Sequence, residues 1–322
     1  MTAGGAPVHR PRLLFVHAHP DDETISTGVS LAHHARLGHD VHVLTCTLGE
    51  EGEVIPPELA HLEGACGDPL APHRRQELAG ALAELGVTGH LLGVDGPEGM
   101  PRTAAGTAYR DSGMAGSAAA GHPLAFAAAD AEEAGRLVRA VVEAVDPDVV
   151  VSYDAHGGYL HPDHVQTHRV TRAALRGMSD PPPLYAVLRP RSWVDEDRTW
   201  LAEHVDPGLG YTVPRPGEPY LPSEVDDALV THATVDPAVG GVQEAALRRH
   251  ATQVVVGEGW FVLSNRVATR LAGREGFARV DLVTGALAST DLVSVASGSG
   301  GRVGRPGPTG AGRPGLLEGV SL

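Results

Sequence analysis

The sequence predicts an α/β fold: a Rossmann-like, mainly parallel sheet with helices on both faces and additional elements appended towards the C-terminus. Two observations predict it. Short apolar runs of strand length alternate with longer segments of helical period. Polar clusters also follow two of the apolar runs directly. Open α/β sheets bind their ligands beyond the carboxyl ends of the strands, so we expect the chemistry at these two corners.

The first half of the chain supplies most of the predicted sheet. Strands are expected at four apolar runs: Leu13–Val16, Val41–Cys46, Leu91–Leu92 and Val149–Tyr153. Helices are expected at residues 23–37, at residues 74–85 and between Asp130 and Pro147. The first two end at Gly38 and Gly86, and the third begins with a capping box of Asp130 and Glu133.

The second half is expected to add strands at residues 184–188 and 229–235 and a helix at 237–254, with Val242 and Leu247 turned inward. Residues 93–129 are rich in Gly, Ala and Pro. They form a longer connection than a compact domain carries without a function, so we interpret them as a substrate-facing loop. We expect a flexible N-terminus (1–11), one domain (12–290) and a low-complexity, disordered tail (291–322).

Composition excludes several classes of function. The formal charge of −15 argues against nucleic-acid or anionic-membrane partners, which need a basic face. All 25 basic residues are arginine, which excludes lysine Schiff-base chemistry. Cys46 and Cys66 are too few for a disulfide framework and are expected to be buried small hydrophobes. With no apolar stretch of membrane-spanning length and no signal-peptide pattern, we expect a cytoplasmic protein.

The polar clusters have the composition of a metal site. His19, Asp21 and Asp22 follow the first strand, and His161 and His164 follow the Val149 run. A catalytic zinc site needs three protein ligands and one open position. His19 and Asp22 lie three residues apart and could point the same way at a helix start, with His164 as the third ligand. Asp21 would then be free to act as a general base.

Other readings of these residues stay open at this stage. Two histidines and one carboxylate also suit Fe²⁺, so zinc is the first candidate and iron the second. Without a metal, the aspartates would be carboxylates favoured at a helix start, and the histidines would be polar loop residues. A nucleotide-binding Rossmann protein is disfavoured, because no Gly-x-Gly-x-x-Gly follows the first strand.

The segment from Ala18 to Glu23 (AHPDDE), paired with HPDH at residues 161–164, resembles the LmbE-like, or PIG-L, family of zinc-dependent N-acetylglucosaminyl deacetylases. The resemblance runs beyond these two motifs over five segments, LLFVHAH (13–19), VHVLTCTLGEEGEVI (41–55), RDSGMAG (110–116), GGYLHPDHVQTH (157–168) and HATQVVVG (250–257). It implies an LmbE-like fold and hydrolysis of an N-acetyl group. The segments are most similar to family members that deacetylate N-acetylglucosaminyl-inositol in actinobacterial mycothiol biosynthesis.

The resemblance also implies roles for further residues. His161 would be a positively charged or proton-donating imidazole that stabilises the tetrahedral intermediate, and Asp163 would orient its ring. Tyr159 would be a mobile donor to the oxyanion, and Arg74 and Asp111 would contact the sugar. Each has an ordinary alternative as a solvated, turn-forming or loop residue. The acidic residues that follow the second strand are expected to form a solvated rim: Glu50, Glu51 and Glu53.

Two alternatives to this function are retained. A mycothiol S-conjugate amidase shares related motifs, although TLGEEGE at residues 47–53 looks like the deacetylase. A non-catalytic sugar-binding protein on the same fold would show damage to the metal residues or the base, and none is visible. The expected partner is a small amino-sugar inositol substrate, and the sequence leaves the oligomeric state open.

Overall fold

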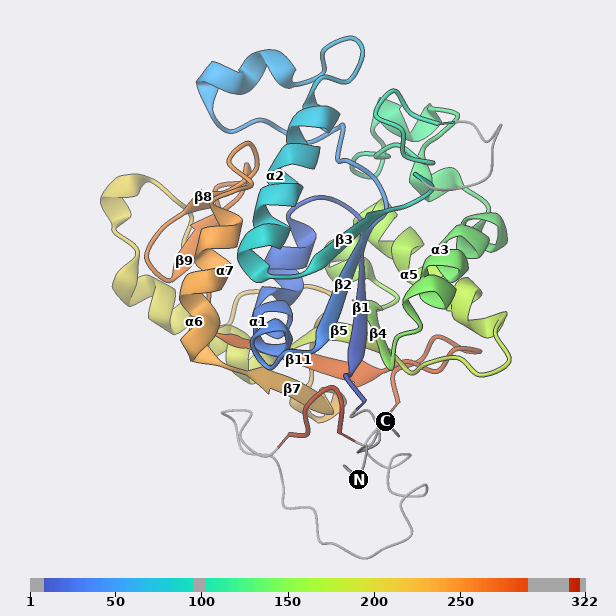
Figure 1. The fold of residues 1–322 in the computed structure, drawn as a ribbon. Coiled ribbons are helices and arrows are strands. Elements are labelled where there is room, and N and C mark those ends of the chain that lie inside the picture. The colour runs from blue at the N-terminus through green and yellow to red at the C-terminus, as the bar shows by residue number, and fades with distance from the viewer. Residues whose placement is uncertain (1–8, 95–101, 289–312, 319–322) are drawn as a thin grey trace, which may run out of the picture.

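The computed structural model describes residues 9–94, 102–288 and 313–318, and a central sheet organises them (Figure 1). The strand order is β3-β2-β1-β4-β5-β11-β7, with β6 paired to β5. The strands are β1 (Arg12–His17), β2 (Asp40–Thr45), β3 (Thr88–Leu91), β4 (Val149–Tyr153), β5 (Leu184–Pro190), β6 (Glu224–Val225), β7 (His232–Val235) and β11 (Arg274–Arg279). Neighbours from β3 to β5 pair in parallel, whereas β11 runs antiparallel to β5 and β7.

Strand β1 shows why these residues form a doubly covered sheet. Leu13 and Phe15 belong to one buried apolar cluster, and Leu14 and Val16 belong to another on the opposite face. Because successive strand residues point to opposite faces, a continuous apolar run requires cover on both sides. The predicted mainly parallel α/β fold is therefore confirmed.

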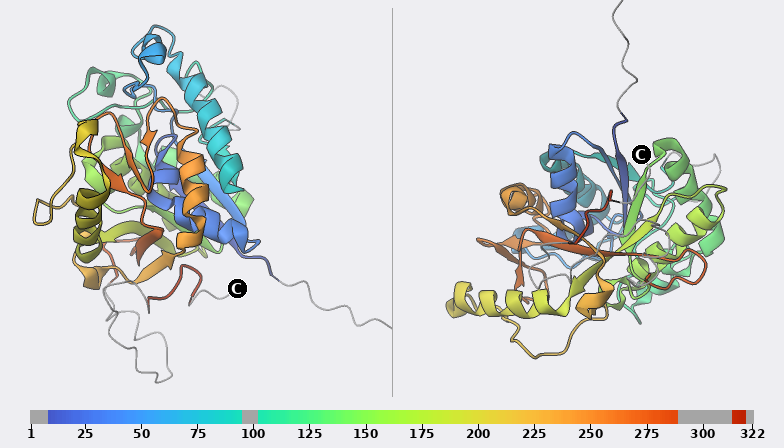
Figure 2. Two further views of the ribbon diagram at one scale, coloured as in Figure 1. Left: turned by 90° about the vertical axis from the view of Figure 1, so that its left-hand side faces the viewer. Right: turned by 90° about the horizontal axis from the view of Figure 1, so that it is seen from below.

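Helices supply that cover. One face carries α1 (Asp22–Arg36), α2 (Leu70–Leu85) and α7 (Gly240–Leu247), and the other carries α3 (Ala131–Val145) and α5 (Pro162–Arg176) (Figure 1). Figure 2 shows α2 in cyan and α7 in orange lying side by side. As predicted, the Asp130 side chain caps α3 by accepting a hydrogen bond from the Glu133 N–H.

The order of the strands fixes where the two polar corners lie. From β1 the chain winds outward through β2 and β3, then returns to place β4 on the other side of β1. This reversal is the topological switch point at which open α/β sheets bind ligands. The segments that leave β1 and β4 therefore lie side by side at the same edge of the sheet.

The C-terminal part differs most from the sequence prediction. The sequence did not predict helix α6 (Arg191–His204) or strand β11. It also did not predict the small antiparallel sheet of β8 (Val255–Val256), β9 (Trp260–Val262) and β10 (Thr269–Arg270). These strands are short or interrupted by glycine and charge, so they carry little periodic signal. The helix expected at 237–254 ends at Leu247, because the following residues form turns that bond to α1 and α2.

Two smaller expectations were also wrong. Val242 is 37% exposed rather than inward, although Leu247 is buried as expected, and Cys66 is exposed whereas Cys46 is buried. The tail expected to be disordered lies mostly outside the described residues, but residues 313–318 pack on the domain. Leu316 is fully buried there, and Pro314 accepts a hydrogen bond from the Ala233 N–H at the edge of β7.

Candidate metal centre and active site

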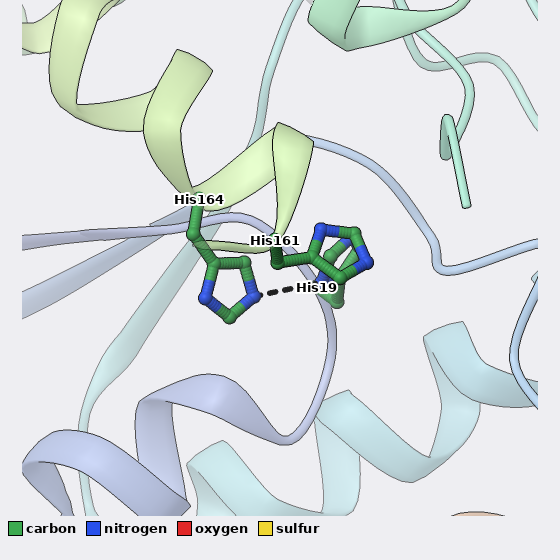
Figure 3. Close-up of side chains that lie close together, drawn as sticks. All are labelled: His19, His161 and His164. Carbon is green, nitrogen blue, oxygen red and sulfur yellow. Dashed lines mark hydrogen bonds between the residues drawn. The ribbon is translucent and has the colours of Figure 1, made fainter. Parts of the chain in front are cut away.

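The two corners meet beyond the ends of β1 and β4. Helix α1 begins at Asp22, three residues after His19, and α5 begins at Pro162, two residues before His164. The short helix α4 (Gly157–Leu160) precedes α5. The imidazoles of His19, His161 and His164 consequently cluster at this edge of the sheet (Figure 3).

Three ligand atoms form a nearly equilateral triangle. Asp22 Oδ2 lies 3.2 Å from both His19 Nδ1 and His164 Nε2, and these two nitrogens lie 3.3 Å apart. Ligands at zinc distances of 2.0–2.2 Å in tetrahedral geometry are separated by roughly 3.3 Å. All three residues are buried. The donor set predicted from the sequence therefore fits one metal ion with an open position.

Hydrogen bonds hold both histidines in the orientation that a metal ligand needs. His164 Nδ1 donates to the Gly157 carbonyl at 3.1 Å, which leaves the Nε2 lone pair directed at the triangle. His19 Nε2 lies 3.3 Å from Asp163 Oδ2 and 3.5 Å from Asp111 Oδ1. Despite its burial, these carboxylates raise the pKa of His19.

Two other groupings of potential ligands exist within the described residues. His161 could join His19 and His164, and Asp111 could join His19 and Asp163. The second grouping uses the opposite nitrogen of His19 and two acceptors that already receive backbone N–H groups. Asp22 Oδ2 also accepts one backbone N–H, that of His19, at 2.9 Å. We favour the triangle with Asp22 because its three donor atoms lie 3.2 to 3.3 Å apart, as tetrahedral ligands of one zinc ion do.

Asp21 lies beside the triangle in an unusual backbone conformation. Its φ is 108°, a value rare for any residue except glycine. Its Oδ2 accepts a hydrogen bond from Arg74 Nη2 at 3.1 Å. Burial raises the pKa of Asp21 to about 6, although the charge of Arg74 opposes this rise. Asp21 lines the same cavity as the triangle, and a pKa of about 6 suits a proton acceptor near neutral pH.

Arg74, expected to contact the sugar, is also bonded to several groups of the protein itself. Its guanidinium donates to the carbonyls of Pro20 and Gly49, and it is 3% exposed while lining the cavity. A Cβ on Gly49 would lie 1.7 Å from the guanidinium, and the φ of Gly49 is 64°. Glycine is required there by this close approach. Arg74 therefore joins the β1 corner to the loop after β2.

The expected solvated rim is wrong for one of its three members. Glu50 is buried, and its Oε2 accepts the Asp111 N–H at 2.9 Å. Burial raises the pKa of Glu50 to about 7. Glu51 and Glu53 are exposed as expected, and the Glu51 N–H donates to Asp111 Oδ2 at 3.2 Å. The loop after β2 thus fixes Asp111, which lines the cavity beside His19.

The structure places His161 and Asp163 differently from the expectation. The Asp163 carboxylate lies against His19 and the Ser112 N–H, so it does not orient the His161 ring. His161 Nδ1 instead accepts the Asp163 backbone N–H at 3.2 Å. Burial and the nearby charges of His19 and His164 lower the pKa of His161 to about 3. The ring is therefore neutral, with its proton on Nε2, and can donate a hydrogen bond.

Tyr159 lies at the rim of the site. Its side chain is exposed, and its ring centroid lies 5.1 Å from that of His164 and 5.9 Å from that of His161. The residues on both sides of it, Gly158 and Leu160, have positive φ angles. The segment is thus an irregular turn that presents the phenol to the cavity.

The site opens into a cavity of about 850 Å³. One face of α1 lines it through Asp22, Ile25, Ser26 and Val29, which recur at helical spacing, and Asp111, Gly113 and Met114 enter from the predicted substrate-facing loop. Residues 95–101 of that loop lie outside the described part of the chain. A cavity of this size accommodates a ligand of two six-membered rings.

Sequence reasoning missed several buried polar contacts that join distant parts of the chain around the site. His250 Nε2 donates to Glu23 Oε1 at 2.9 Å, and both side chains are fully buried. Glu77 accepts two hydrogen bonds from Thr252, and Glu275 accepts two from α1. The resemblance in HATQVVVG includes His250, but no local pattern pairs it with a residue 227 positions away.

Within the described residues, no helix is both long and apolar enough to cross a membrane.

Comparisons with known proteins give the context of this site. The model of the PIG-L family, described as GlcNAc-PI de-N-acetylase, matches residues 14–175, about half of the chain. The chain is 43% identical over 274 residues to a 1D-myo-inositol 2-acetamido-2-deoxy-alpha-D-glucopyranoside deacetylase of Actinosynnema mirum, covering 83% of this chain and 91% of the relative. A protein of the same name from Thermobifida fusca is 42% identical over 275 residues, with the same coverage.

Among solved structures, a deacetylase–teicoplanin complex is similar with a TM-score of 0.46 and 19% identity, covering 84% of this chain and 99% of that one. The matched family segment contains both corners of the site, and the identity to the two relatives extends over most of the chain. The chain belongs to the PIG-L family.

Proposed function

We propose that this protein is a metal-dependent deacetylase that hydrolyses the N-acetyl group of N-acetylglucosaminyl-inositol, releasing acetate and glucosaminyl-inositol for mycothiol biosynthesis. The ligand triangle of His19, Asp22 and His164, with Asp21 beside it, is the observation that carries the chemistry. The names of the relatives from Actinosynnema mirum and Thermobifida fusca support the substrate.

Zn²⁺ is the metal that this donor set favours, and Fe²⁺ is the alternative. His19 and His164 would bind it through Nδ1 and Nε2, and Asp22 would bind it through Oδ2. Bound there, zinc would polarise the acetamide carbonyl and lower the pKa of a water molecule towards neutrality.

The remaining residues carry the proton transfers. Asp21 takes a proton from the attacking water as its oxygen bonds to the carbonyl carbon. The Nε2–H of His161 and the hydroxyl of Tyr159 donate hydrogen bonds to the oxygen that becomes negative. When the carbon–nitrogen bond breaks, the leaving nitrogen receives a proton from Asp21 or His161, and the products are acetate and an amine.

Arg74 and Asp111 complete the proposed site. Both line the cavity, so they are available to the substrate hydroxyls, and both also fix other members of the site. Arg74 holds the Asp21 carboxylate, and Asp111, like Asp163, faces His19. Both aspartates therefore serve the metal ligand His19, and Asp111 is also available to the substrate. We expect the reaction to take place in the cytoplasm.

The test is amine release by the zinc-loaded protein from N-acetylglucosaminyl-inositol, measured beside release from a mycothiol S-conjugate. We expect kcat/KM to be higher for the former. A preference for the conjugate would identify an amidase instead. No release from either, in protein that contains stoichiometric zinc, would refute the proposal, and binding of N-acetylglucosaminyl-inositol without turnover would identify the non-catalytic sugar-binding protein.

A further inference from the structure

A buried chain of hydrogen bonds joins the backbone of Asp21, through Glu23, to His250 in the C-terminal part of the sequence. The Asp21 N–H donates to Glu23 Oε2 at 2.9 Å. Glu23 Oε1 accepts from Thr24 Oγ1 at 2.5 Å and from His250 Nε2 at 2.9 Å. Glu23 and His250 are both fully buried. Neither residue reaches the cavity, so the chain of bonds lies behind the site.

The Asp21 backbone needs such support. Its φ of 108° and ψ of −35° lie outside the regions that non-glycine residues ordinarily occupy. Conformations of this kind persist only where the surroundings determine them. Arg74 holds the Asp21 carboxylate from one side, and Glu23 holds the Asp21 N–H from the other. The two contacts together set the direction of the carboxylate.

His250 in turn determines the position of Glu23. A carboxylate in a fully buried setting needs a charged partner or several hydrogen bonds, and the imidazole supplies an ion pair. Within the described part of the chain, His250 Nδ1 has no hydrogen-bond partner, so the side chain's polar contact is with Glu23. Helix α7 holds this arrangement in place, because Gln243 donates to the Thr24 carbonyl at 3.0 Å.

We propose that His250, acting through Glu23, is a positioning residue that fixes the strained backbone of Asp21 and so aims the general base. This inference rests on the proposed function, in which Asp21 accepts the proton from water. Glu23 and His250 themselves touch neither substrate nor reacting atoms. Their contribution is to keep the Asp21 carboxylate in one orientation, where a small misplacement would slow the reaction.

The test compares three variants of the full chain, each loaded with zinc. His250→Leu removes the bond to Glu23, and His250→Gln restores a neutral donor. Thr252→Val is the matched control: Thr252 is a fully buried residue of the same turn, and its hydroxyl donates to Glu77 at 2.7 Å without a link to Asp21. The measurements are kcat and KM for amine release, zinc affinity by competition with a chelator, and the NMR shift of the Asp21 amide proton.

We expect kcat of His250→Leu to fall between about 10-fold and 100-fold, with KM and zinc affinity within about threefold of the unsubstituted protein. The Asp21 amide proton should move upfield as it loses its carboxylate acceptor. His250→Gln should recover most of kcat, and Thr252→Val should keep kcat within about twofold and the amide shift unchanged.

The inference is overturned if Thr252→Val loses as much kcat as His250→Leu, or if the loss in His250→Leu follows the loss of zinc. It is equally overturned if the Asp21 amide shift does not move. Should His250→Leu not fold, His250→Asn carries the test, because its shorter side chain does not reach Glu23. A kcat below that of Thr252→Val together with an altered Asp21 amide shift supports the positioning role, and unchanged kcat and amide shift refute it. Absence of amine release from the unsubstituted protein would refute the proposed function instead. The Asp21 amide shift would still show whether His250 and Glu23 fix the Asp21 backbone.

Discussion

The two corners that form the site differ in how firmly they are held. After β1, the residues from His19 to Glu23 are buried and each has a partner from a different element. After β4, Tyr159 is 45% exposed and Leu160 is 56% exposed, in a turn with four successive residues outside helical geometry. The first corner carries two of the three proposed metal ligands, His19 and Asp22, and the proposed base. The second carries the buried third ligand, His164, and the exposed turn that faces the cavity.

This difference has a functional meaning. A metal ligand set and a general base work best when their geometry is fixed before the substrate arrives. A hydrogen-bond donor to the developing oxyanion gains from freedom to follow the substrate into the transition state. The β1 corner therefore resembles a packed core made of polar groups, whereas the turn that precedes His161 in the β4 corner resembles a loop. The following predictions test this comparison, from the largest expected effect to the smallest.

Removal of the metal should have the largest effect. The three proposed ligands are buried and their donor atoms converge on one point, so no other group in the site can take over the role of the ion. We expect chelation to reduce amine release at least about 1,000-fold, and added Zn²⁺ to restore it. Metal content measured on the same samples provides the control. Full activity in protein shown to be metal-free would disprove the metal centre.

The next largest effect should come from Asp21→Asn. The amide keeps the shape of the side chain but cannot accept a proton. We expect kcat to fall roughly 100-fold to 10,000-fold, with zinc content and KM nearly unchanged. Steady-state kinetics and metal analysis check this together. A rate within about threefold of the unsubstituted protein would show that Asp21 is not the base.

Glu275 tests whether buried polar contacts to α1 stabilise the helix that follows the β1 corner. It accepts the N–H groups of Val29 and Ser30 in α1 at 2.7 and 2.9 Å, and burial raises its pKa to about 7. Because this pKa is higher in the folded than in the unfolded chain, the protonated carboxyl stabilises the fold at low pH. That contribution is lost as the pH rises through about 7.

Relative to Glu275→Gln, the free energy of unfolding of the unsubstituted protein should therefore fall by roughly 2 to 3 kcal/mol between pH 5 and pH 8. Urea unfolding at several pH values measures it. Glu132→Gln, at an exposed carboxylate on α3, should show no such trend. A constant difference between Glu275→Gln and the unsubstituted protein across this range would show that Glu275 does not titrate there.

The smallest effect should come from the β4 corner. Tyr159→Phe removes one hydroxyl from an exposed, irregular turn. We expect kcat to fall about tenfold, which corresponds to the loss of one hydrogen bond in the transition state, while KM and zinc affinity stay unchanged. A loss as large as that of Asp21→Asn, or loss of zinc, would show that the two corners are equally constrained.

The comparison also explains what the sequence could predict. His19, Asp22 and His164 could be brought together from sequence, because they follow apolar runs whose strands lie next to each other in the sheet. The sequence could not predict that Asp163 turns towards His19, that Glu50 is buried, or that Arg74 holds Asp21 as well as lining the cavity. These depend on how irregular loops pack against each other, and such contacts leave no periodic pattern.

The most direct test of the account is anomalous diffraction at the zinc edge from crystals of the zinc-loaded protein. We predict one peak about 2.0 to 2.2 Å from His19 Nδ1, Asp22 Oδ2 and His164 Nε2, with the Asp21 carboxylate beside it and not bonded to it. A peak between His19 Nε2, Asp111 and Asp163, or one coordinated by Asp21, would contradict both the ligand set and the role of the base.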